Sequence, residues 1–217
     1  MSSAAIKAVL WDFGGVILTS PFEAFRRYES EKGLPADFIR GVNSRNPHGN
    51  AWARFERGEI DADAFDDLFL AESTALGHAL HGREILPLIS GTLRPRMVAA
   101  LRQVKSRFKI ACLTNNMPLG HGPGMALQAD RAAAIAEVMT LFDAVVESSK
   151  IGIRKPEPGF YLKACDMLGI TPEQAVFLDD LGINLKPAAA MGMRTIKVGD
   201  PDLALQELAQ IIGMEFA

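Results

Sequence analysis

Five short apolar runs of β-forming residues constrain the fold more than any other feature of this sequence. They are IKAVLW, FKIACL, DAVVE, AVFL and RTIKV, at residues 6–11, 108–113, 143–147, 175–178 and 194–198. The second to the fifth run are separated by segments with the periodicity of helices. Strands that alternate with helices in this way are typical of βαβ units and a parallel sheet. The sequence therefore predicts a doubly wound α/β core.

A long helical insertion is predicted after the first strand, because residues 12–107 are too many for one crossover helix. Ser20-Pro21-Phe22-Glu23 fits a capping box with proline at the first helical position, and the pattern runs to a glycine stop at Gly33. NAWARFERG and DADAFDDLFLAES continue the helical pattern. We therefore predict a small helical cap domain at residues 19–90, inserted into a core made of residues 1–18 and 91–217.

Charge and hydropathy exclude several classes of protein. The formal net charge of −3 gives no electrostatic footprint for nucleic acid. No apolar run approaches the ~18 residues that span a bilayer, and MSSAAIK lacks the cationic-then-apolar order of a signal peptide. Cys112 and Cys165 both lie in apolar runs, which favours two reduced core thiols over a disulfide. We expect a cytoplasmic protein that binds neither nucleic acid nor a membrane.

Polar side chains follow four of the predicted strands where each strand ends. They are Asp12 after the first run, Thr114 and Asn115 after the second, Lys155 after the third, and Asp179 and Asp180 after the fourth. Open α/β sheets bind ligands beyond the carboxyl ends of their strands. Carboxylates are hard oxygen ligands for Mg²⁺, while lysine, hydroxyl and amide groups suit a phosphate. The pattern predicts a magnesium and phosphate site with Asp12 as candidate nucleophile.

Four motifs, in this order, resemble those of the haloacid-dehalogenase-like (HAD) superfamily, within it the phosphatase-like N-terminal domain of soluble epoxide hydrolases. They are WDFGGVIL at 11–18, LTNN at 113–116, RKPEPGFY at 154–161 and FLDDLGINLKPAAAMGMRTIKV at 177–198. The resemblance spans nearly the whole chain. It implies a Rossmann-like core, a cap domain and Mg²⁺-dependent phosphoryl transfer.

The resemblance also implies a role for each matching residue. For the metal, it implies ligands from Asp12, Asp180 and the main-chain carbonyl of Gly14. For the phosphoryl group, it implies Asp12 as nucleophile, Thr114 and Asn115 as hydrogen-bond donors, and Lys155 as a catalytic residue that bridges Asp12 and phosphate. Asp179 and Asn184 would support these groups from behind.

Position 14 departs from the pattern that the resemblance implies. Phosphatases of this superfamily usually carry a second aspartate two residues after the nucleophile, which protonates the leaving oxygen and then activates water. Gly14 has no carboxylate. General acid–base catalysis contributes ~10²–10⁴-fold, so the substitution predicts a slow phosphatase. His121, in the loop after the Thr114 motif, is an alternative source of the proton.

The function that we expect is Mg²⁺-dependent hydrolysis of a small phosphomonoester metabolite through an aspartyl-phosphate on Asp12. Two alternatives stay open. One is a catalytically weakened phosphate-binding or regulatory module, for which Gly14 is the only support. The other is a haloacid dehalogenase, which needs no metal and which the Asp179-Asp180 pair disfavours. The sequence leaves open the natural substrate, the oligomeric state, the physiological role and the source of acid/base catalysis.

Overall fold

A parallel five-stranded sheet lies at the centre of the computed structural model, which describes residues 4–216. Its strands are β1 (Ala8–Trp11), β2 (Lys109–Thr114), β3 (Ala144–Glu147), β4 (Ala175–Asp179) and β5 (Arg194–Lys197). The strand order is β3-β2-β1-β4-β5, and every neighbouring pair is parallel. All five predicted runs form strands, which confirms the predicted doubly wound α/β core.

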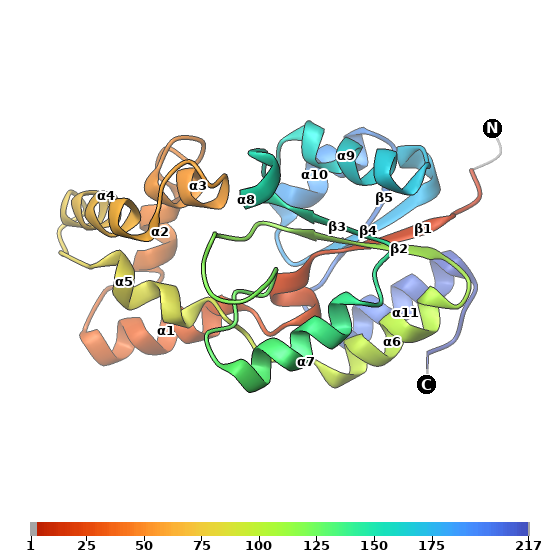
Figure 1. The fold of residues 1–217 in the computed structure, drawn as a ribbon, viewed down its shortest axis with the longest axis horizontal. Helices are drawn as coiled ribbons and strands as arrows, with labels where there is room; N and C mark the ends of the chain where they lie inside the picture. Colours follow the sequence, from red (N-terminus) through yellow and green to blue (C-terminus); the bar gives the residue numbers. More distant parts are fainter. Residues whose placement is uncertain (1–3, 217) are drawn as a thin grey trace.

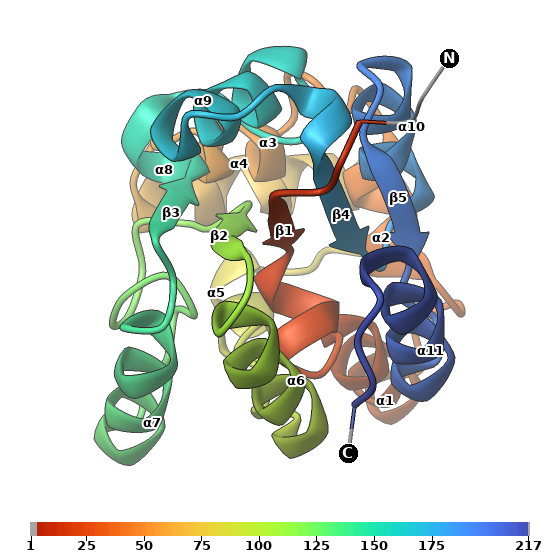
Figure 2. The ribbon, with the colours of Figure 1, turned by 90° about the vertical axis from the view of Figure 1, so that its right-hand side faces the viewer.

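Helices cover both faces of the sheet (Figures 1 and 2). One face packs against α6 (Pro95–Lys105), α7 (Ala129–Met139) and α11 (Pro201–Ile212). The other packs against α9 (Pro158–Leu168) and α10 (Gly182–Ala190), with the short α8 (Ser148–Ile151) and η3 (Pro172–Gln174) nearby. Successive residues of β1 point to opposite faces, so Val9 joins one hydrophobic cluster and Leu10 the other. Because both faces are covered, all four residues of β1 are buried.

A segment of helices, residues 21–88, separates β1 from β2 after the short turn η1 (Phe13–Ile17). This cap segment contains α1 (Pro21–Lys32), α2 (Phe38–Ser44), α3 (Ala51–Glu56), α4 (Ala62–Thr74), α5 (Gly82–Ile85) and η2 (Leu86–Leu88). Figure 1 shows it beyond one end of the sheet. A hydrophobic cluster centred on Phe55, Phe65 and Phe69 holds it together and also includes Met117 of the loop after β2. The division into a cap at 19–90 and a core at 1–18 and 91–217 stays a proposal.

The two connections of the cap segment run side by side. Leu18 and Leu93 form an antiparallel bridge, and the Thr19 N–H donates to the Thr92 carbonyl at 2.9 Å. A Cβ on Gly91 would lie 2.4 Å from the Thr19 carbonyl oxygen, so only glycine allows this close approach. The chain therefore enters and leaves the cap segment at one place.

The start of α1 differs in one respect from the sequence prediction. The helix begins at Pro21 and ends before Gly33, whose φ of 65° is typical of a glycine cap. The predicted capping box is wrong, because the Ser20 side chain caps no N–H of the first turn. Its hydroxyl instead donates to Oδ2 of Asp180 at 3.3 Å.

Among the helices of residues 4–216, none combines the length and the apolar character that crossing a membrane requires.

Candidate active site

The turn after β1 places Asp12 at the carboxyl end of the central strand. The Asp12 N–H donates to the Leu178 carbonyl at 2.9 Å, and the carboxylate accepts from the Phe13 N–H at 2.6 Å. Two glycines then shape the turn differently. Gly15 has φ of 80°, and a Cβ there would come within 2.2 Å of Oδ2 of Asp180. Gly14 has extended angles, φ −69° and ψ 130°, and a Cβ there would meet no atom within 4 Å. Only Gly15 is therefore required by the local structure.

Lys155 joins two of the strand-end carboxylates. Its Nζ lies 2.8 Å from Oδ1 of Asp12 and 2.8 Å from Oδ2 of Asp179, and the side chain is 1% exposed. Burial alone lowers the pKa of this ammonium, but the charges of Asp12 and Asp179 outweigh burial and hold the pKa above its usual value. Lys155 is thus a fixed positive charge against the candidate nucleophile.

Asp179 is held from behind by Asn184. The Asn184 amide Nδ2 donates to both oxygens of Asp179, at 3.1 and 3.0 Å, and the Leu181 N–H donates to Oδ1 at 2.8 Å. The Tyr161 hydroxyl donates to the Asn184 carbonyl at 2.7 Å. These bonds fix the orientation of the Asp179 side chain, which in turn holds the Lys155 ammonium in place.

Three carboxylates crowd together at this end of the sheet. Oxygens of Asp12, Asp179 and Asp180 lie within 4.8 Å of one another, which is close enough to hold one metal ion. Burial and then the Asp179 charge raise the pKa of Asp180 to about 6. Burial, followed by the charges of Asp179 and Asp180, also raises the pKa of Asp12 despite the opposing effect of Lys155. Three carboxylates face one ammonium, so a divalent cation here would relieve the excess negative charge.

Thr114 and Asn115, at the end of β2, contribute to the site in two different ways. Thr114 is 3% exposed and lines the cavity next to Asp12. The Asn115 side chain is occupied by the backbone of Lys155: Nδ2 donates to the Lys155 carbonyl at 3.0 Å, and Oδ1 accepts from the Lys155 N–H at 2.8 Å. Within the described residues, the Asn115 backbone N–H has no hydrogen-bond acceptor. Asn115 therefore offers a ligand its backbone N–H, while its side chain holds Lys155.

A cavity of about 490 Å³ lies between these residues and the cap segment. The strand-end groups Asp12, Gly14, Thr114, Asn115, Lys155 and Asp180 line one side, so the structure brings these six predicted site residues together. Asn184 also lines the cavity. The walls opposite include the apolar side chains of Phe22, Phe25, Trp52 and Ile89 and the polar side chains of Arg40 and His48. The site thus combines a charged floor with largely apolar walls.

Three residues that sequence reasoning missed also belong to this region. Ser20 binds Asp180, and Glu56 of α3 forms an ion pair with Arg154 at 2.5 Å between Oε2 and Nε. Glu56 and Arg154 are 98 residues apart in the chain, so no local pattern could have paired them. Arg154 adjoins Lys155, and that position is the only signal the sequence offers.

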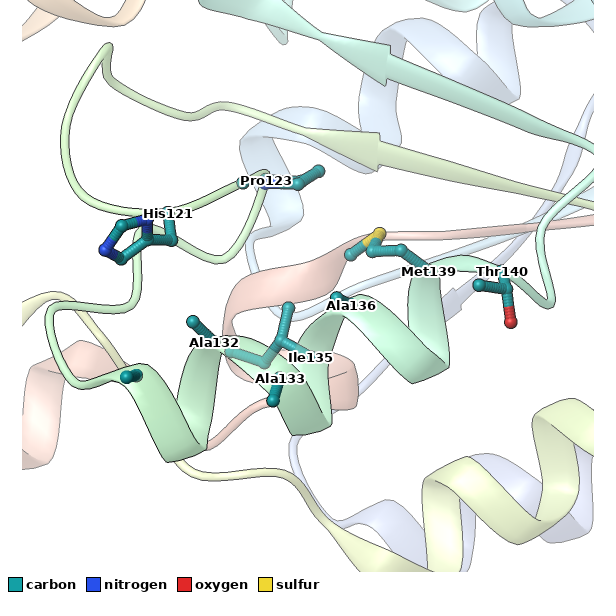
Figure 3. A pocket seen from close by; sticks show the side chains of 10 residues that line it. His121, Pro123, Ala132, Ala133, Ile135, Ala136, Met139 and Thr140 are labelled. Atoms are coloured by element: carbon teal, nitrogen blue, oxygen red, sulfur yellow. The ribbon is translucent and has the colours of Figure 1, made fainter.

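Figure 3 shows a second cavity, of about 690 Å³, between the loop after β2 and α7. His121 and Pro123 lie on the loop side, and small or apolar side chains such as Ala132, Ile135 and Met139 lie on the helix side. Its lining holds no carboxylate and no lysine, so it lacks the groups that phosphoryl chemistry needs. His121 lines this second cavity and not the cavity at Asp12, which leaves its predicted role in proton transfer without structural support.

Comparison with known proteins supplies the family. A family model for haloacid dehalogenase-like hydrolases matches residues 6–192. The chain belongs to this family. As a HAD-like hydrolase it shares its fold with a HAD family enzyme from Bacteroides thetaiotaomicron, solved in complex with magnesium and inorganic phosphate. That superposition has a TM-score of 0.60 at 19% identity, and it covers 90% of this chain and 96% of that one.

Two curated relatives agree with the HAD-like assignment. Mouse bifunctional epoxide hydrolase 2 is 33% identical over 98% of this chain and 40% of its own length. A sesquiterpene phosphatase from Aspergillus oryzae is 28% identical over 95% of this chain and 97% of its own length. The HAD-like chain spans between 19% and 40% of the length of four mammalian proteins that it matches. The predicted resemblance to HAD hydrolases is confirmed, and phosphatases are among the relatives.

Proposed function

We propose that this HAD-like hydrolase is a Mg²⁺-dependent phosphomonoesterase that forms an aspartyl-phosphate on Asp12. The observation that carries the proposal is the position of the Lys155 ammonium, 2.8 Å from the Asp12 carboxylate and beside the Asp180 carboxylate that shares the cavity. A nucleophile, a fixed cation and a second carboxylate around one cavity suit a doubly charged phosphate ester. A dehalogenase needs no such surplus of carboxylates.

The residues present fit Mg²⁺. Asp12, Asp180 and the Gly14 carbonyl offer hard oxygen donors, which Mg²⁺ prefers, and it completes its shell with water and substrate phosphate. The excess of carboxylates over ammonium groups is the local feature that favours a divalent cation. When bound, Mg²⁺ would neutralise charge on the phosphoryl oxygens.

The chain's own residues account for the two transfer steps. A carboxylate oxygen of Asp12 attacks phosphorus, and the bond from phosphorus to the alcohol oxygen breaks with its electron pair on that oxygen. The Thr114 hydroxyl and the Asn115 backbone N–H donate to the phosphoryl oxygens, and Lys155 holds Asp12 in place. Water then cleaves the aspartyl-phosphate, releases phosphate and restores Asp12. Because Gly14 carries no carboxylate, the protons of both steps come from solvent or from a group outside position 14.

The apolar walls of the cavity favour a small phosphomonoester whose alcohol part is largely hydrocarbon. Phe22, Phe25 and Trp52 would bury such a group at about 25 cal/mol per Å² of apolar surface. The sesquiterpene phosphatase relative supports this choice of substrate class. The comparison of butyl phosphate with glycerol 1-phosphate, two esters of similar length and different polarity, tests it: kcat/KM should be higher for butyl phosphate.

Hydrolysis of p-nitrophenyl phosphate by purified protein tests the reaction class. Activity should require Mg²⁺, vanish with chelator and return on addition of Mg²⁺. Asp12→Asn should abolish turnover, whereas Asp166→Asn, an exposed carboxylate on α9 far from the cavity lining, should leave it unchanged. Phosphate binding without turnover would favour the regulatory-module alternative. Release of chloride from 2-chloropropionate without Mg²⁺ would favour the dehalogenase.

A further inference from the structure

Glu56 is a buried carboxylate of the cap segment whose two oxygens are both engaged. Oε1 accepts from the Trp52 indole N–H at 2.9 Å. Oε2 lies 2.5 Å from Nε of Arg154 and 3.3 Å from Nδ2 of Asn115. Glu56 is 7% exposed, and a buried carboxylate with this many partners has a fixed orientation. The cap segment therefore contacts the core through a group that cannot turn freely.

The two residues of the core that contact Glu56, Arg154 and Asn115, are both connected directly to Lys155. Arg154 is the preceding residue in the chain, and its Nη1 donates to the Pro47 carbonyl at 3.2 Å, which gives it a second contact in the cap segment. Asn115 brackets the Lys155 peptide, because its Oδ1 accepts from the Lys155 N–H and its Nδ2 donates to the Lys155 carbonyl. The same Nδ2 group reaches Glu56. The Glu56 carboxylate is thus connected to Lys155 twice, once through Arg154 and once through Asn115.

The neighbouring helices form a close contact that supports this arrangement. Figure 1 shows α3, which ends at Glu56, beside α8 of the core. Gly58 follows with φ of 68°, and a Cβ there would come within 2.6 Å of the Ser149 carbonyl oxygen. The backbones of cap segment and core therefore touch next to Glu56, which leaves its carboxylate little room to move away from Arg154.

We propose that Glu56 is a positioning residue, which couples docking of the cap segment on the core to the placement of Lys155. The inference rests on the proposed phosphatase function, in which Lys155 faces Asp12. When the cap segment lifts, Arg154 and Asn115 lose their shared carboxylate, and the Lys155 peptide is held less tightly. Full catalytic geometry is then present only when the cap segment encloses the substrate, so phosphoryl transfer is tied to closure and to the exclusion of water.

Two substitutions of Glu56 and one matched control test the proposal. Glu56→Ala removes all three contacts, and Glu56→Gln keeps the shape of the side chain but removes its charge. The control is Arg57→Gln, because Arg57 is the next residue and also reaches the core, at 3.8 Å from Glu157, without contacting Arg154, Asn115 or Lys155. Two quantities are measured in each variant: kcat and KM for p-nitrophenyl phosphate with Mg²⁺, and the hydrogen-exchange rate of the Lys155 amide by mass spectrometry.

Glu56→Ala should lower kcat by about 10-fold or more, since small misplacements of a catalytic group are costly, and should change KM by less than about threefold. It should speed exchange of the Lys155 amide by about 10-fold, because the Asn115 bond to that amide opens more often. Glu56→Gln should lie between the wild type and Glu56→Ala. Arg57→Gln should leave both quantities within about twofold of the wild type.

Several results would overturn the proposal. In folded Glu56→Ala protein, an unchanged exchange rate at Lys155 or an unchanged kcat would show that Glu56 does not position Lys155. Equal effects of Arg57→Gln would show a general loosening of the cap segment. If Glu56→Ala does not fold, Glu56→Gln decides by the same criteria. A wild type without phosphatase activity would refute the proposed function, and the exchange measurement would then decide the link between Glu56 and Lys155 by itself.

Discussion

Gly15 lies directly against the carboxylate of Asp180, so closely that a Cβ on Gly15 would come within 2.2 Å of Oδ2. Its φ of 80° is in the left-handed region that disfavours other residues. Gly14, the preceding residue, has ordinary extended angles and open space at its Cβ position. The two glycines of one turn therefore differ in what a side chain would do.

The first prediction follows from this difference. Gly15→Ala should weaken Mg²⁺ binding by at least about 10-fold, because the methyl group displaces Asp180 and the left-handed backbone adds about 1–2 kcal/mol of strain. Gly14→Ala should bind Mg²⁺ within about twofold of the wild type, since it keeps the carbonyl and meets no neighbour. Isothermal titration calorimetry measures both affinities. Equal affinities in the two variants would contradict a metal site at Asp180.

The second prediction concerns Gly14→Asp. The open space and extended backbone at position 14 accept an aspartate without strain, and position 14 faces the cavity. The carboxylic acid there should protonate the leaving oxygen, and the carboxylate that results should then activate water, which raises steady-state turnover by up to ~10²-fold. With p-nitrophenyl phosphate, whose leaving group needs no proton, the wild type should show a burst in rapid-quench experiments. If there is neither a burst in the wild type nor a gain in Gly14→Asp, another group already does the acid/base work.

The third prediction separates a side chain that caps a helix from one that does not. Ser20 makes no capping bond to α1, and Ser20→Ala removes only the long hydrogen bond to Asp180 at 3.3 Å, so it should change the free energy of unfolding by less than about 0.5 kcal/mol. Asp61 accepts from the Ala64 N–H at 2.9 Å at the start of α4, and Asp61→Ala should cost about 1 kcal/mol. Urea denaturation of both variants measures the difference. A loss for Ser20→Ala as large as that for Asp61→Ala would show that the serine stabilises the fold as much as a capping residue does, through α1 or through Asp180.

The fourth prediction concerns the pH dependence of stability through Asp66 of α4. Its carboxylate accepts from the Arg83 backbone N–H at 2.9 Å and from the Arg83 guanidinium, with Nε at 2.7 Å, and these bonds hold the pKa of Asp66 well below its usual value. A carboxylate whose pKa is lowered on folding stabilises the protein above its unfolded pKa, near 3.9, and this contribution is lost as the pH falls toward the folded value.

Asp66→Asn should therefore lower the free energy of unfolding by about 1 kcal/mol at pH 7, a modest value because the Arg83 side chain is largely exposed. The difference from the wild type should shrink as the pH falls below about 4. Denaturation curves at pH 7, 5 and 3 measure it. Asp67→Asn, an exposed neighbour on the same helix, is the control and should show no such trend. A constant difference at all three pH values would show that the Asp66 charge is not involved.

The sheet and the polar strand ends were within reach of the sequence. β-branched and apolar runs define the five strands, and a parallel sheet necessarily brings the residues after its strands to one edge. Asp12, Thr114, Lys155 and Asp180 could therefore be placed around one cavity before their distances were known. Strand boundaries shifted by one or two residues, as for β1, which begins at Ala8 where the run begins at Ile6.

The hydrogen-bond partners of the site residues could not be predicted from the sequence. Ser20 has an acceptor at Asp180 that is 160 residues away, and this contact outweighs the local capping pattern. Asn115 reads as a phosphate donor, yet its amide is occupied by the Lys155 backbone 40 residues further along. Such choices depend on which groups meet in three dimensions, because a hydrogen bond to a charged or fixed partner outcompetes a weak local one. Local sequence patterns carry no information about these contacts between residues that are distant in the chain.

The antiparallel bridge between Leu18 and Leu93 makes the helical insertion an exchangeable module. Its two roots are neighbours, so a different insert whose ends lie equally close could replace it without moving a strand of the sheet. Under the proposed function, the insert would select the alcohol part of the substrate, while the residues at the strand ends would react with phosphorus. If Glu56 positions Lys155 as proposed, a new insert would support catalysis only if it also placed a carboxylate beside Arg154.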